Sequence, residues 1–213
     1  MKFKFDIVAK YYNTLEILAF GKILYGTRLC FLTRSSNPIN ILLVGEGTGC
    51  FLKCLANCNP KSSITVIDSS KRMIKVIHEC NYTTKVEDIT ILHQDYFNYS
   101  PIIKYDLIYT NFFLDCFKSA DVLKIVGNIK SMLNETGEWN DVDFTKPNVS
   151  NLLNYTYNKL ILNVLYKSFR LICKIESVSI KDVDFNHQKL GFILDREMIY
   201  QFPPVRVRRY KLA

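Results

Sequence analysis

Three glycines at alternate positions, Gly45, Gly47 and Gly49, form the part of the sequence best suited to binding a ligand. Four apolar residues at 41–44 lead directly into them, as in a buried parallel strand that ends in a loop. Glycine suits such a loop because the backbone must turn sharply and let a ligand approach where a Cβ would clash. The nineteenth residue after Gly49 is Asp68, which ends a second apolar strand and can accept hydrogen bonds from two ribose hydroxyls. Together these features predict a nucleoside-binding half of an α/β sheet, and a bare glycine-rich turn is the alternative.

The spacing of the glycines separates the known classes of nucleotide site. A dinucleotide fingerprint, G-x-G-x-x-G, needs its third glycine at position 50, which is Cys50, and no P-loop string occurs in the chain. The spacing found, G-x-G-x-G after an apolar strand, resembles the first motif of class I S-adenosylmethionine-dependent methyltransferases. That family usually carries Asp or Glu at the position of Leu43, so one expected cofactor anchor is missing here. Glu46 is a nearby acid, but it stands in the loop itself.

Two later segments also resemble this family. Residues 89–95 read as a third strand, and Asp95 or Gln94 matches the acid that binds the adenine amino group in the family. An ordinary strand-ending aspartate in a turn is the alternative. Residues 105–108 match the family's common entry into the fourth strand, after which Asn111 falls at the end where open α/β sheets place ligands.

The amino-terminal segment 5–13 is similar to the opening of small-molecule methyltransferases, including the ubiquinone and menaquinone biosynthesis group. In those enzymes a helical cap covers the cofactor, and the tyrosine matched by Tyr12 helps to close the site. An amphipathic helix that uses its tyrosines for packing is the alternative. As a whole, the resemblance implies S-adenosyl-L-methionine as cofactor, and it assigns the binding site to Tyr12, Gly45, Glu46, Gly47, Gly49, Asp68, Ser69, Met73, Gln94, Asp95, Tyr96 and Asn111.

The implied reaction is a direct displacement on a methyl group that its sulfonium already activates, so the protein mainly holds donor and nucleophile in line. A base helps only if the acceptor is a hydroxyl or an acidic carbon. Candidates at strand ends are Asp115, Asp143, His93 and the neighbouring Asp141. Asp115 also fits the N-cap of a helix over 116–133, and His93 also fits a hydrogen-bonded core histidine.

Aromatic side chains are numerous after the predicted fourth strand, in the fifth strand and in the predicted helix over 149–173. They can form the wall of an apolar acceptor pocket or simply belong to the core, and the sequence does not separate these roles. The residues in question are Phe112, Phe113, Phe117, Trp139 and the tyrosines at 155, 157 and 166.

The order of elements predicts an α/β fold, a Rossmann-like, doubly wound and mostly parallel seven-stranded sheet with a late antiparallel strand. Residues 1–36 are expected to form an N-terminal helical cap, and residues 37–213 a single S-adenosylmethionine-binding domain. We expect a helix over Asp115–Leu133 ended by residues 134–137, a fifth strand over 137–144, and a long helix over 149–173. Strands around Gly191 in the segment 175–211 are expected to add an antiparallel hairpin.

Composition narrows the class of protein further. With 48% hydrophobic and 13% aromatic residues, the chain of 213 residues can bury a large core, which argues against disorder. No apolar run approaches the ~20 residues needed to cross a bilayer, and the first residues lack the apolar region of a signal peptide. The seven cysteines include no C-x-x-C pair, so no metal site is predicted, and their odd number suits the cytoplasm.

The net charge of +8 raises the question of a nucleic-acid partner. The lysines are spread along the chain, and the tight basic cluster at 206–211 also fits an exposed sheet edge protected by cations. After the fourth strand, the chain lacks the proline pair typical of enzymes that methylate base amino groups. We therefore expect a cytoplasmic methyltransferase, of undetermined oligomeric state, acting on a small, apolar or aromatic molecule at O, N or C. The alternatives are a nucleic-acid (RNA) methyltransferase and a catalytically inactive binding protein with the same fold.

Overall fold

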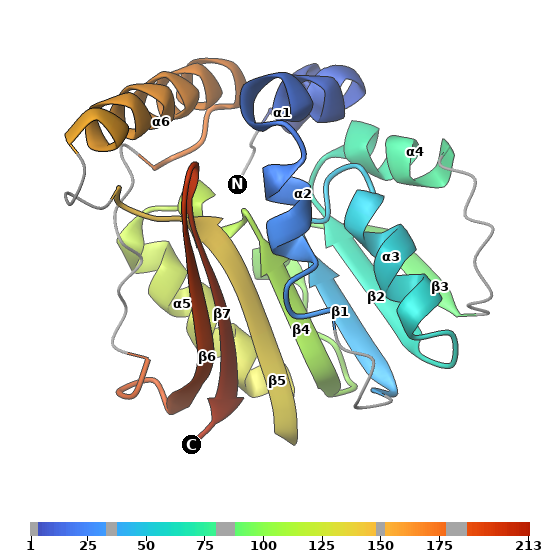
Figure 1. Cartoon of the computed structure of the whole chain (residues 1–213). Helices are drawn as coiled ribbons and strands as arrows, with labels where there is room; N and C mark the ends of the chain where they lie inside the picture. The colour runs from blue at the N-terminus through green and yellow to red at the C-terminus, as the bar shows by residue number, and fades with distance from the viewer. Residues whose placement is uncertain (1–3, 33–37, 80–87, 148–151, 178–186) are drawn as a thin grey trace.

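The structure is a computed structural model that describes residues 4–32, 38–79, 88–147, 152–177 and 187–213. Its centre is one sheet of seven strands in the order β3-β2-β1-β4-β5-β7-β6 (Figure 1). The strands are β1 (Asn40–Val44), β2 (Ser63–Asp68), β3 (Ile89–His93), β4 (Tyr105–Asn111), β5 (Leu133–Phe144), β6 (Phe192–Gln201) and β7 (Pro204–Leu212). Strands β1 to β5 run parallel, and β7 runs antiparallel to both of its neighbours. The predicted fold class is therefore confirmed.

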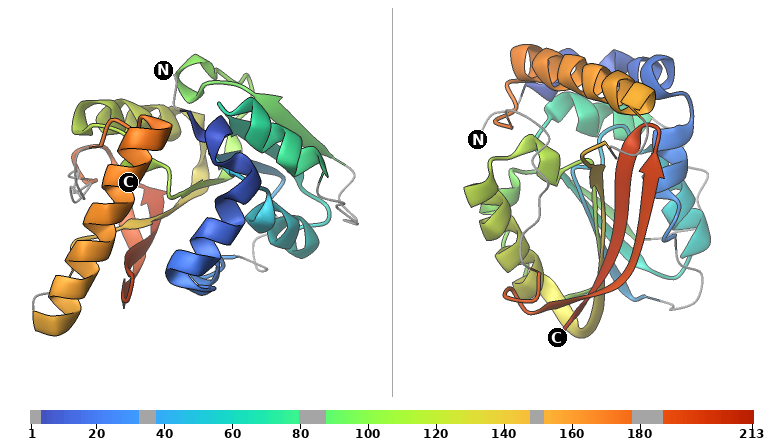
Figure 2. Two further views of the ribbon diagram at one scale, coloured as in Figure 1. Left: turned by 90° about the horizontal axis from the view of Figure 1, so that it is seen from above. Right: turned by 60° about the vertical axis from the view of Figure 1, so that its left-hand side comes forward.

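The helices cover both faces of the sheet and the ends of its strands. They are α1 (Tyr12–Phe20), α2 (Ile23–Arg28), α3 (Cys50–Cys58), α4 (Lys71–Glu79), α5 (Ser119–Met132) and α6 (Leu152–Cys173), with single 3₁₀ turns at Phe5–Ile7, Ala9–Tyr11, Tyr96–Asn98 and Leu114–Cys116. Helices α3 and α4 cover one face and α5 the other, while α1 and α6 lie across the carboxyl-terminal end of the parallel strands (Figures 1 and 2). None of the described helices has both the length and the apolarity needed to cross a bilayer.

The pattern of apolar and capping residues in the sequence explains how β1 packs and where α4 begins. Strand β1 is apolar on both sides because each side is covered by helices: Leu42 packs toward α5, and Leu43 packs toward α3 and α4. Helix α4 begins after Ser70, whose Oγ accepts a hydrogen bond from the backbone N–H of Met73 at 3.1 Å. Ser70 is therefore the N-cap of α4.

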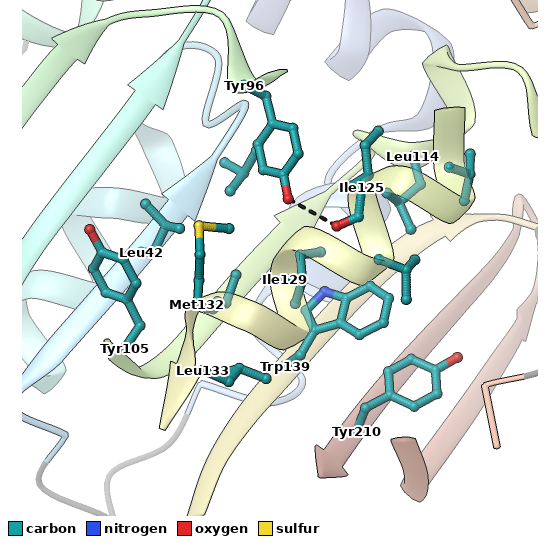
Figure 3. Packing of buried hydrophobic residues seen from close by; sticks show 14 of the residues in the cluster. Leu42, Tyr96, Tyr105, Leu114, Ile125, Ile129, Met132, Leu133, Trp139 and Tyr210 are labelled. Carbon is teal, nitrogen blue, oxygen red and sulfur yellow. Dashed lines mark hydrogen bonds between the residues drawn. The ribbon is translucent and has the colours of Figure 1, made fainter. Parts of the chain in front are cut away.

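The core beneath α5 is rich in aromatic rings (Figure 3). Trp139 is fully buried, and its ring centroid lies 4.7 Å from that of Tyr210 and 5.3 Å from that of Phe192. Its indole N–H donates to Oγ1 of Thr110 at 2.9 Å, which satisfies the one polar atom of the side chain. Of the two roles that the sequence left open for Trp139, pocket wall and core, the structure therefore shows the core.

Two predicted boundaries around α5 were also wrong. The helix begins at Ser119, with Lys118 at its N-cap position, so Asp115 does not cap it. Residues 134–137 do not terminate the helix, since they lie within β5, which begins at Leu133. Pairing of β5 with β4 decides this: Leu133 lies opposite Tyr105, a contact between residues distant in sequence.

The basic segment 206–211 lies on β7, between β5 and β6, so its interpretation as a sheet edge was wrong. Its cations meet acids on the two neighbouring strands. Arg208 Nη2 lies 2.6 Å from Asp141 Oδ2, and Arg209 Nε lies 3.5 Å from Glu138 Oε2. The hairpin turns at residues 202–203 rather than at Gly191, which precedes β6.

Candidate functional site

The glycine loop connects β1 to α3 and has the left-handed backbone that its composition suggested. The φ angles of Gly45, Gly47 and Gly49 are 66°, 71° and 83°. A Cβ on Gly45 would lie 2.7 Å from the Phe113 ring, whereas a Cβ on Gly47 would have no atom of the described chain within 4 Å. The loop is therefore tightly packed at its first glycine and open at its second.

Asp68, at the carboxyl end of β2, faces this loop. Its two carboxylate oxygens accept backbone hydrogen bonds, Oδ2 from Gly47 at 3.2 Å and Oδ1 from Ser70 at 2.8 Å. Burial raises the pKa of Asp68 to about 6, against the lowering effect of these two donors. The side chain is thus held rigidly beside the loop, and it is ionised at neutral pH.

A cavity of about 90 Å³ opens where β1, β2 and β4 end. Every residue assigned to the cofactor from the sequence lines it, except Gly49, which instead occupies the N-cap position of α3. The lining residues are Phe5, Tyr12, Arg28, Val44, Gly45, Glu46, Gly47, Ile67, Asp68, Ser69, Met73, Gln94, Asp95, Tyr96, Asn111, Phe112, Phe113, Cys116 and Phe117. Residues from six separate segments of the chain therefore meet at one end of the sheet.

Leu43, which stands where the resembled family has an acid, is 1% exposed and packs into the core on the α3 side of the sheet. Glu46 lines the cavity instead, and its Oε1 accepts the backbone N–H of Leu52 in the first turn of α3 at 2.8 Å. Burial raises the pKa of Glu46 to about 7, partly offset by that hydrogen bond and by Arg28. The acid of this chain thus lies in the loop, close to Asp68.

Two polar side chains at the end of the sheet have distinct surroundings. Asn111 is 8% exposed, and within the described residues no group donates to its Oδ1, which suits a ligand that brings an N–H or O–H. Asp95 accepts a hydrogen bond from Phe97 at 3.0 Å and so caps the 3₁₀ turn that follows β3. Asp95 therefore has both of the roles considered for it, since it caps a turn and also lines the cavity.

Arg28 is a cavity residue that sequence reasoning missed. Its two terminal nitrogens each lie 2.6 Å from an oxygen of Glu16, and its guanidinium stands 4.8 Å from the centre of the Phe112 ring. No local pattern predicts this position, because Arg28 reaches the cavity only when α1 and α2 fold over the sheet.

The amino-terminal segment is fastened to α4 by Asp6. Its Oδ1 accepts hydrogen bonds from Ser70 Oγ at 2.6 Å and from the backbone N–H of Arg72 at 2.9 Å. These bonds hold the neighbouring Phe5 and Tyr12 against the cavity, where the Tyr12 ring centroid is 6.4 Å from that of Phe169 on α6.

A second and larger cavity, of about 650 Å³, lies between α1, α6 and the end of β5. Its lining is mainly apolar and includes Leu15, Phe20, Phe144, Leu165 and Phe169. The two cavities are adjacent, since both are lined by a common set of side chains: Phe5, Tyr12, Phe112 and Cys116. A ligand in the first cavity would therefore be separated from a ligand in the second by little more than these side chains.

The candidate catalytic residues fall in different places. Asp115 lines the larger cavity, with Asp143 buried behind it at 2% exposure. His93 lies at the end of the outer strand β3 and lines neither cavity, and its Nε2 is 3.1 Å from the carbonyl oxygen of Ser69. Because its side chain is exposed, the expectation of a core histidine was wrong. Asp141 is fully buried and bonds Arg208 and Thr110, which gives it a structural role.

Among the aromatic candidates, Phe112, Phe113 and Phe117 line the smaller cavity, and Phe112 also lines the larger one. Tyr166 lines the larger cavity from α6, whereas Tyr157 is 52% exposed and stacks on Phe202. The structure thus divides a set of aromatic residues that the sequence could not sort.

Residues 41–137 match the family model described as a methyltransferase domain. Malonyl-[acyl-carrier protein] O-methyltransferase 2 of Ilyobacter polytropus is 37% identical over 84 residues, which is 38% of this chain and 30% of that protein. The matched segment thus spans less than a third of this curated relative.

Solved structures share the fold at low identity. The DhpI–SAH complex has a TM-score of 0.69 at 13% identity and covers 98% of this chain and 93% of its own. N-methyltransferase NodS from Bradyrhizobium japonicum WM9, in complex with S-adenosyl-l-homocysteine, has a TM-score of 0.60 at 17% identity, covering 89% of this chain and 84% of its own.

Proposed function

We propose that this protein transfers a methyl group from S-adenosylmethionine to a small molecule that is mainly apolar or aromatic, and the match of residues 41–137 to a methyltransferase domain supports this. The cofactor supplies a methyl group already activated by its sulfonium, so the chain has to bind, orient and desolvate the two reactants. The acceptor itself is not specified by the match, which covers only part of the curated relative.

We assign the cofactor to the smaller cavity on the chemistry of its walls. The Asp68 carboxylate is placed to accept the ribose hydroxyls, beside the open space at Gly47. The buried Oδ1 of Asn111 needs a donor, which the amino group of the methionyl part can provide. Residues 4–32 fold over this cavity, which supports the division into a cap at 1–36 and a cofactor-binding domain at 37–213.

The observation that carries the proposed function is the contact between the two cavities. A methyl donor held at the ends of β1 and β2 must present its sulfonium to an acceptor within a few ångströms. The larger, apolar cavity adjoins the smaller one at Phe112 and Cys116, so an acceptor held there would lie next to the cofactor site.

The same geometry weighs against a nucleic-acid acceptor. Recognition of nucleic acid depends on free cations that contact phosphates. The basic cluster on β7 faces acids of its own sheet, since Arg208 bonds Asp141 and Lys211 lies between Glu138 and Asp195. The cluster that raised this alternative is therefore largely neutralised within the fold.

The experiment that tests the proposal is a calorimetric titration with S-adenosylhomocysteine of the wild type, Asp68→Ala and Asp195→Asn. The last variant is the control, because Asp195 lies on β6 far along the sheet from the cavity. We expect micromolar binding by wild type and control, and its loss in Asp68→Ala. A wild-type protein that does not bind S-adenosylhomocysteine would contradict the proposed enzyme activity and favour a cofactor-free binding protein.

A further inference from the structure

Two acidic side chains meet at the wall of the larger cavity. Asp115 is partly exposed, and the space that it faces is the cavity. Its Oδ2 accepts a hydrogen bond from the hydroxyl of Tyr166 at 2.8 Å, and the thiol of Cys116 lies 3.6 Å from its Oδ1. Asp143, from the end of β5, is buried and lies close enough to the Asp115 carboxyl for each group to shift the pKa of the other. We refer to Asp115 and Asp143 as the carboxyl pair.

Burial and the lack of donors show which member of the carboxyl pair holds a proton. Asp143 is buried, and among the described residues no N–H or O–H donates to either of its oxygens. Two ionised carboxylates that share one buried place repel each other, so one member holds a proton. Asp115 receives the Tyr166 hydroxyl, which stabilises its ionised form, and the proton therefore resides on Asp143.

The charged and titratable neighbours agree with a single negative charge on the pair. Asp141 stands on the same strand as Asp143 and is neutralised by Arg208 of β7 at 2.6 Å. Other groups that face the pair are Tyr166 and Cys173 on α6, Cys116, Tyr12 and, through Tyr12, Arg28 on α2. Burial raises the pKa of Asp115, and burial followed by the charges of Asp115 and Asp141 raises the pKa of Asp143 well above its usual range.

We propose that Asp115 accepts the proton of a hydroxyl-bearing, otherwise apolar acceptor in the larger cavity, and that protonated Asp143 is its positioning residue. This inference rests on the proposed function. The acceptor oxygen attacks the methyl carbon, and the carbon–sulfur bond breaks with its electron pair kept on sulfur, which becomes a neutral thioether. The hydroxyl proton passes to Asp115, and from there to solvent when product leaves. A hydroxyl fits better than an ammonium group, which would have to lose its hydration among apolar walls.

The site can be tested without knowing the natural acceptor. The probes are 4-nitrophenol, whose absorption distinguishes its neutral and ionised forms, and nitrobenzene, which has the same ring without the hydroxyl. Binding of each is measured for the wild type, Asp115→Asn, Asp143→Asn, Asp143→Ala and the control Asp195→Asn. The ratio of the two affinities reports the hydroxyl contact alone, so a general loss of folding or packing cancels.

The two asparagine variants should behave oppositely. Asn cannot act as an anionic acceptor, so the ratio of the affinities for 4-nitrophenol and nitrobenzene should be at least tenfold lower in Asp115→Asn than in the wild type. Asn does resemble a protonated aspartic acid in shape and as a donor, so Asp143→Asn should keep the preference within about threefold, while Asp143→Ala loses it. The absorption of bound 4-nitrophenol should shift toward the ionised form in the wild type, Asp143→Asn and the control Asp195→Asn, and should not shift in Asp115→Asn or Asp143→Ala.

Three results would overturn the inference: a wild type without preference for 4-nitrophenol, an Asp115→Asn variant that keeps it, or an Asp143→Asn variant that loses as much as Asp115→Asn. Titration with S-adenosylhomocysteine is run on the same samples. Because the phenol probes need no cofactor, a failure of cofactor binding with intact phenol discrimination would contradict the proposed function and leave the hydroxyl site standing.

Discussion

Binding of S-adenosylhomocysteine should weaken as the pH falls through about 6, because the proposed ribose contact needs ionised Asp68. Burial raises the pKa of this carboxyl to about 6 in the empty site, and protonation removes its ability to accept two hydroxyl donors. At about pH 8 nearly all molecules are ionised, whereas at about pH 5 only about one in eleven is. The affinity should therefore fall about tenfold between these values, equivalent to about 1.4 kcal/mol.

The substitution Asp68→Asn tests the same contact at fixed pH. It replaces charge-assisted hydrogen bonds, each worth about 1.5–3 kcal/mol, so affinity at about pH 8 should fall roughly tenfold to a hundredfold or more. Its pH profile should also be nearly flat below pH 6.

Glu46 is the neighbour that could produce a similar profile, since it lines the same cavity and its pKa is raised to about 7. Glu46→Gln is therefore the matched control, and it should retain the loss of affinity below pH 6. Calorimetry at a series of pH values, with buffers of differing ionisation enthalpy, measures both affinity and proton uptake. A wild-type profile that is flat from about pH 8 to about pH 5, or an Asp68→Asn profile with the wild-type slope, would refute the reasoning.

Three further perturbations test the structure around the site. Asp143→Asn should gain stability relative to the wild type as pH rises. The buried Asp143 has a raised folded-state pKa and keeps a proton that the unfolded chain releases, so its contribution to the stability of the wild type is lost with increasing pH. Thermal melts from about pH 5 to about pH 8 measure the difference in stability between the two proteins, and a constant difference would contradict the assignment of the proton to Asp143. Arg208→Met should cost about 3–5 kcal/mol in urea unfolding because it leaves Asp141 buried without its cation, and a cost below about 1 kcal/mol would indicate that Asp141 is neutral. Gly45→Ala, with φ of +66° and a Cβ only 2.7 Å from Phe113, should both destabilise the fold and weaken S-adenosylhomocysteine binding, and unchanged binding would show that the loop does not shape the site.

The parts of the fold set by local sequence could be predicted. The glycine loop, the acid at the end of β2 and the alternation of apolar strands with helices depend on neighbouring residues, and these led to the cavity residues. These features could be recognised because the turn and the two strands beside it are close together in the sequence.

Features that depend on contacts between distant segments could not be predicted. The basic segment on β7 looked like a sheet edge because nothing within it indicates that β6 will pair with its far side. Trp139 and Tyr166 are both aromatic, yet one is enclosed beneath α5 and the other lines the larger cavity. Arg28 and the contact between Asp115 and Asp143 likewise appear only after α1, α6 and β5 come together.

The most direct measurement of the central claim is a crystal structure of the protein soaked or grown with S-adenosylhomocysteine. We expect the ribose hydroxyls to contact Asp68, the amino group of the methionyl part to lie at Asn111 Oδ1, and the sulfur to point toward Phe112 and Cys116, where the two cavities meet. Density for the ligand elsewhere, or a sulfur directed away from the larger cavity, would contradict it.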